Sequence, residues 1–87
     1  MRVFQDGQGR HWVATVRRRP GNDYKGRYYF FLSPRGAEDA EGVALIDIRW
    51  NSERSAERAL ETISDVELRR RLRSGVGRQR PAQAIGA

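Results

Sequence analysis

The chain has 87 residues, no cysteine, and 17 basic against 11 acidic residues, which gives a net charge of +6 at pH 7. A chain of this length is expected to form one small domain, and without cysteine it can build neither a disulfide framework nor a thiolate metal site. The charge falls into blocks of +6 (residues 1–37, eight basic and two acidic), −6 (38–67, three and nine) and +6 (68–87, six and none), and separated charge of this kind steers polyanions or oppositely charged proteins.

The first two thirds of the chain predict four β-strands. Short runs of aromatic and β-branched residues are separated by turn sequences rich in glycine and proline. The predicted strands are Arg2–Gln5, Arg10–Arg18, Arg27–Ser33 and Val43–Trp50. Because every connection is too short for a crossover helix, we expect an antiparallel sheet in meander order.

Strand alternation predicts which side chains face the core. The expected inward residues are Trp12, Ala14 and Val16 on the second strand, and Ala44, Ile46, Ile48 and Trp50 on the fourth. The third strand is apolar on both faces, which is typical of a central strand. Its outward residues are either Arg27, Tyr29 and Phe31 or Tyr28, Phe30 and Leu32, and we expect the first set.

A first helix is predicted from about Glu53 to Thr62, with Asn51 or Ser52 as its N-cap. It has a single apolar stripe, so it can cover only one side of the sheet. The stripe consists of Ala56, Ala59, Leu60 and Ile63.

A second, shorter helix is predicted from Asp65 to Arg73. Ser64 and Glu67 match a capping box at its start, and Ser74–Gly75 are expected to end it. Residues 76–87 have little to bury and are expected to form a flexible basic tail. The sequence therefore predicts an α+β domain over residues 1–75, in which a four-stranded antiparallel meander is followed by two helices packed on one face.

Residues that could support catalysis or bind a metal are few. His11 is the only histidine, and Glu38, Asp39 and Glu41 lack the spacing of a cation loop. We therefore expect neither enzymatic activity nor a metal or cofactor. The N-terminus has no apolar signal segment, and the longest apolar run, Tyr28–Leu32, is too short to span a bilayer. We expect a cytoplasmic protein without membrane association.

Arginines and aromatic residues are expected to meet on the outward face of the sheet. A basic hairpin tip adjoins this face, since Arg17, Arg18 and Arg19 precede the turn and Lys25 follows it. The candidate binding residues are Arg17, Arg18, Arg19, Lys25, Arg27, Tyr29, Phe31 and Arg49.

Three uses of this face remain open from the sequence. Tyrosine, phenylalanine and arginine are enriched in protein interfaces, including those of homodimers. The same residues can stack bases and bind phosphates, and the tail could also cover the face. The prediction is a small non-enzymatic basic binding module with a protein-interaction or regulatory role, including self-association, and nucleic-acid binding is the alternative.

Overall fold

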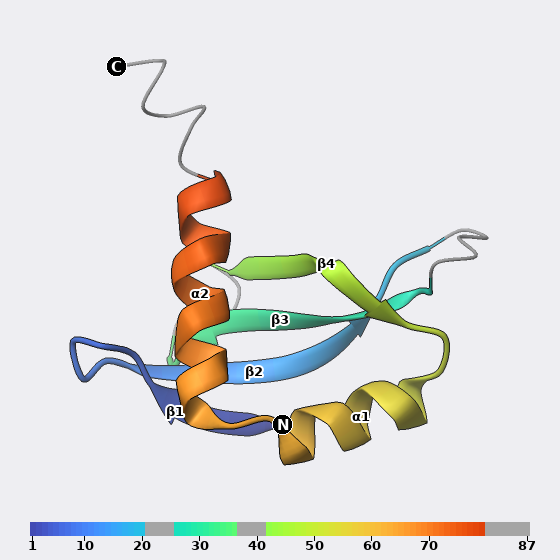
Figure 1. Ribbon diagram of the computed structural model, residues 1–87, viewed down its shortest axis with the longest axis horizontal. Helices are drawn as coiled ribbons and strands as arrows, with labels where there is room; N and C mark the ends of the chain where they lie inside the picture. Colours follow the sequence, from blue (N-terminus) through green and yellow to red (C-terminus); the bar gives the residue numbers. More distant parts are fainter. Residues whose placement is uncertain (21–25, 37–41, 80–87) are drawn as a thin grey trace.

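The computed structural model describes residues 1–20, 26–36 and 42–79. The elements are β1 (Arg2–Gln5), β2 (His11–Arg18), β3 (Tyr28–Pro34), β4 (Val43–Trp50), α1 (Glu53–Thr62) and α2 (Asp65–Gln79). The strands form one antiparallel sheet in the order β1-β2-β3-β4, and both helices pack on the same side of it (Figure 1). The predicted α+β fold is confirmed. We call the other side, which no described helix covers, the helix-free face.

The core lies between the sheet and the two helices. Phe30 and Leu32 of β3 are 1% and 0% exposed, so the predicted orientation of this strand is confirmed. Leu60 of α1 and Leu68 of α2 pack into the same cluster. Tyr29 and Phe31 therefore point to the helix-free face.

The predicted orientation of β4 is wrong over its first half. Ile46 was expected inside but is 47% exposed, whereas Val43 and Leu45 are buried. Ile48, in the second half of the strand, is 43% exposed but lines a pocket on the side of α2. A bulge is the reason, because Leu45 pairs with Phe30 and Trp50 pairs with Tyr28. Four residues of β4 thus lie opposite one of β3, and such a bulge resets the alternation of side chains.

The bulge returns Trp50 to the core side at the end of β4. Its ring stacks on Phe30 with 4.5 Å between the ring centroids. Trp50 is therefore inward as predicted, although the simple alternation from Ala44 to Trp50 is absent.

Helix α1 has the predicted bounds. The backbone N–H of Ser55 donates to Oγ of Ser52 at 3.1 Å, so Ser52 is the N-cap. Ala56 and Leu60 of the apolar stripe are buried. A local cap and one apolar stripe were sufficient to define this element.

The end of α1 is fixed by an arginine from β1. The guanidinium of Arg2 donates to the carbonyl oxygens of Leu60 (2.9 Å), Glu61 (3.3 Å) and Ile63 (2.7 Å). It also forms an ion pair with Asp65 in the first turn of α2, at 2.5 Å. Arg2 thus satisfies carbonyls that a helix end leaves without intrahelical partners, and joins the first strand to both helices.

Helix α2 begins as predicted but continues to Gln79, so the predicted end at Ser74–Gly75 is wrong. The N–H of Glu67 donates to Oγ of Ser64 at 3.1 Å. Gly75 is not a C-cap: a Cβ there would lie 2.7 Å from Cγ1 of Val43, so glycine allows the helix to approach β4 closely. Residues up to 79 are helical rather than part of the predicted tail, and 80–87 lie outside the described residues.

None of the helices among the described residues is both long and apolar enough to cross a bilayer.

Candidate functional site

Three arginines lie together at one end of the helix-free face. Arg17 is paired directly with Tyr29 across β2 and β3. The N–H of Arg19 donates to the carbonyl of Arg27 at 2.6 Å, which extends this pairing beyond the ends of the strands. Because side chains alternate along a strand, Arg17, Arg19 and Arg27 share the face that bears Tyr29. We call these three residues the arginine cluster.

The end of β4 adjoins the arginine cluster. The N–H of Arg27 donates to the carbonyl oxygen of Trp50 at 3.1 Å. Since Trp50 faces the core, alternation places its neighbour Arg49 on the helix-free face, where it is half-buried with its Nε buried. The outward position predicted for Arg49 is thus reached through the bulge.

Phe31 supports an arginine instead of offering an open ring. The Cζ of Arg17 lies 3.7 Å from the centroid of the Phe31 ring, within the range of a cation–π contact. The tip of the ring occupies the place that a Cβ of Gly42 would need. One face of the ring is therefore covered by Arg17, and the ring position is fixed by Gly42. Tyr29, which is paired with Arg17 on the neighbouring strand, is the second aromatic residue beside the arginine cluster.

The electrostatics of the cluster favour an anion. Like charges directly opposite one another on neighbouring strands destabilise a sheet, and Arg19 and Arg27 are such neighbours. A guanidinium that is already stacked on a ring has lost part of its rotational freedom, so it loses less entropy when it binds. The cluster can therefore bind phosphate or carboxylate groups, with Arg17 held in advance.

Not every predicted residue joins this cluster. Arg18 alternates to the helix-covered side, where it pairs with Tyr28. Lys25 lies outside the described residues, as do Glu38, Asp39 and Glu41. Within ranges 1–20, 26–36 and 42–79, no group of three histidine or acidic side chains is placed to hold a metal ion.

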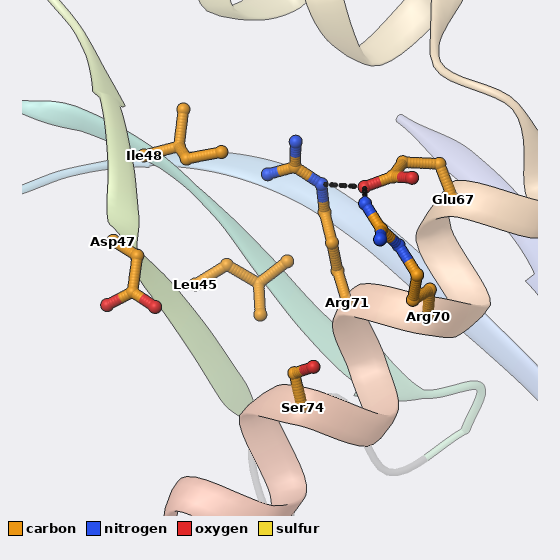
Figure 2. A pocket seen from close by; sticks show the side chains of 7 residues that line it. All are labelled: Leu45, Asp47, Ile48, Glu67, Arg70, Arg71 and Ser74. Carbon is orange, nitrogen blue, oxygen red and sulfur yellow. Dashed lines mark hydrogen bonds and ion pairs between the residues drawn. The ribbon is translucent and has the colours of Figure 1, made fainter.

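A pocket of about 330 Å³ between β4 and α2 is a second candidate (Figure 2). Figure 2 shows that Arg70 and Arg71 on its wall both donate to Oε2 of Glu67, at 2.9 and 3.0 Å. The hydrogen bond from Arg70, followed by that from Arg71, holds the pKa of Glu67 below its ordinary value. Because the two arginines share an acidic partner within the pocket, part of their positive charge is already neutralised there.

Sequence reasoning missed two features of the helix-free face. Val13, which alternation along β2 points to this face, is only 6% exposed, and its partner Ser33 on β3 is 2% exposed. The contact between Gly42 and Phe31 was also missed. No local pattern marks either feature, since both depend on how the strands pair.

The arginine cluster carries positive charge on exposed and half-buried side chains, and the rings of Tyr29 and Phe31 lie beside it on the same face. No protein-family model matches the chain, and neither does any curated protein or solved structure. The proposed function therefore depends on the chemistry of the surface itself.

Proposed function

We propose that this protein is a non-enzymatic module that binds nucleic acid through the arginine cluster and Tyr29. The observation that supports this most is the placement of three arginines on adjoining strands of the helix-free face. A nearby anion lowers the repulsion between Arg19 and Arg27, which lie directly opposite one another. A phosphate backbone supplies such anions at regular spacing, and its neutralisation releases counterions.

Each residue of the surface has a distinct part in this proposal. Arg17, stacked on Phe31, presents a guanidinium whose fork matches two phosphate oxygens. Arg19 and Arg27 add phosphate contacts on either side of the hairpin. Tyr29 can stack on an unpaired base or pack against a sugar. With one ring available, phosphate contacts dominate, and little sequence preference is expected.

A protein partner or a second copy of the chain suits this surface less well. Such interfaces need a contiguous apolar centre. Among the described residues, the exposed large apolar side chains of the helix-free face are Val3 on β1 and Ile46 on β4, which are the two edge strands of the sheet. The ring of Phe31, which motivated the idea of a partner interface, is engaged by Arg17. We therefore favour nucleic acid, bound in the cytoplasm, over self-association.

A salt titration tests the proposal. The chain is expected to bind generic duplex DNA and RNA at about 50 mM salt. On duplex DNA, log K should fall linearly with log salt at a slope of about −0.9 per neutralised phosphate, or about −3 for the arginine cluster. Fluorescence anisotropy with a labelled duplex measures both quantities. Absence of binding at the low salt concentration, or a slope near zero, would contradict the proposal.

A further inference from the structure

A second pocket lies on the opposite side of the sheet from the arginine cluster. It has a volume of about 480 Å³ and lies between the β1–β2 turn and the C-terminal half of α2. This volume is in the range of sites for small molecules. Its lining consists of Asp6, Gly7, Gln8 and Arg10 of the turn, Trp12 of β2, and Leu72, Arg73 and Val76 of α2.

The turn that forms one wall is held by a network around Asp6. Its Oδ1 accepts the backbone N–H groups of Gln8 and Arg10, both at 2.9 Å, and its Oδ2 accepts the indole N–H of Trp12 at 2.9 Å. The hydrogen bond from Trp12, together with those from the two backbone groups, holds the pKa of Asp6 below its ordinary value. Both oxygens of the carboxylate thus have partners within the wall, and the indole is fixed. A wall ordered in this way is formed before any ligand binds.

The floor of the pocket is apolar. Trp12 and Leu72 are 7% and 4% exposed, and Val76 packs half-buried against the same core. Val76 reaches this position because α2 continues past Gly75. This part of the pocket floor therefore depends on the continuation of the helix past Gly75. A hydrocarbon or aromatic group placed on this floor would gain from removal of its surface from water.

Each wall of the pocket carries an arginine, Arg10 on the β1–β2 turn and Arg73 on α2. The Cζ of Arg10 lies 5.5 Å from the centroid of the Trp12 ring, and Arg73 is exposed on α2. Asp6, the one acidic residue of the lining, stays ionised and attracts Arg10, but the two guanidinium groups outnumber this carboxylate, so the rim keeps a net positive charge. An apolar floor beneath two guanidinium groups matches a ligand with an anionic head and an apolar body.

We propose that this pocket binds a small amphiphilic anion, a carboxylate or phosphate group attached to an aliphatic or aromatic body. Arg73 and Arg10 bind the head, and the surface of Trp12, Leu72 and Val76 receives the body. The site is independent of nucleic-acid binding because its residues lie on the helix-covered side of the sheet.

Titration of the full chain with four probes tests this site. The readout is the indole N–H resonance of Trp12 in a ¹H–¹⁵N spectrum, assigned with a Trp50→Phe variant. Octanoate or octyl phosphate is expected to shift this resonance saturably. The probe with the higher affinity identifies the preferred head group. Octanol lacks the charge and inorganic phosphate lacks the body, so each should bind at least about tenfold more weakly.

Single substitutions locate the binding. Arg73→Gln is expected to weaken the preferred probe about tenfold, since a charge-assisted hydrogen bond is lost. Arg58→Gln on α1 is the matched control, because it removes the same charge from an exposed helix position outside the pocket. Equal affinity of Arg73→Gln and the unaltered chain would overturn the proposal. So would octanol binding as tightly as the charged probes, or the absence of any saturable shift.

Discussion

Replacement of Gly26 by alanine is expected to lower the free energy of unfolding by about 3 kcal/mol. Gly26 has φ +109°, a region that side chains with a Cβ avoid. A Cβ at this position would also lie 2.6 Å from the carbonyl oxygen and 2.8 Å from the carbonyl carbon of Trp50. Both atoms belong to the backbone of β4, so relief of the collision requires the strand to move. The same carbonyl accepts the N–H of Arg27, and this hydrogen bond would be disturbed as well.

Gly9→Ala is the matched control for Gly26. Gly9 also has a positive φ of +82°, but a Cβ there would meet nothing within 4 Å. This variant should therefore show only the backbone strain, about 1 kcal/mol. Urea denaturation measures the free energy of unfolding of both variants, and the difference between their losses gives the cost of the collision with Trp50. Equal losses of stability would show that β3 and β4 do not approach closely at Gly26.

Arg2→Ala is expected to cost about 2 kcal/mol of stability, because hydrogen bonds from a charged donor contribute more than neutral ones. The side chain of Arg2 is only 24% exposed and binds carbonyl oxygens at the end of α1 together with Asp65. Without it these carbonyls lose a shared donor, and the link between β1 and the helices is broken. Thermal or urea denaturation measures the loss.

Two further variants show whether the loss of stability comes from the hydrogen-bonding geometry of the Arg2 guanidinium. Arg2→Lys keeps the charge but cannot reach three carbonyls and a carboxylate from one flat group, so less than half of the stability should return. Arg54→Ala removes an exposed arginine of α1 and should change stability by less than about 0.5 kcal/mol. If Arg2→Ala costs no more than Arg54→Ala, the role assigned to Arg2 is wrong.

The elements with local signals could be predicted from the sequence. Ser52 and the apolar stripe defined α1, and Ser64 correctly marked the start of α2. The orientation of β4 could not be predicted, because its alternation of Ala44, Ile46 and Ile48 continues through the bulge. The end of α2 was missed because Gly75 resembles a C-cap, whereas its role is to let the helix approach Val43. Arg2 acts across the whole fold, on residues about sixty positions away, and no spacing in the sequence indicates that contact.

The candidate site was predictable in outline. Alternation along β2 and β3 placed Arg17, Tyr29 and Phe31 on one face, in agreement with the strand register. The sequence did not predict that Phe31 would stack against Arg17. Phe31 supports Arg17 because the strands place Gly42 under the tip of its ring, and that contact depends on the pairing of β3 with β4.

Binding of duplex DNA by two triple variants tests the central proposal most directly. One variant replaces the arginine cluster with glutamine (Arg17→Gln, Arg19→Gln and Arg27→Gln). The control replaces three exposed arginines of the helix layer, Arg54, Arg58 and Arg70, with glutamine as well, so the two variants have the same net charge.

The arginine-cluster variant is expected to bind at least about tenfold more weakly near 50 mM salt, with a salt slope smaller by about 2.7. The control should stay within about threefold of the unaltered chain, since long-range charge alone is largely screened. Equal losses in the two variants would mean that net charge, and not the helix-free face, determines binding.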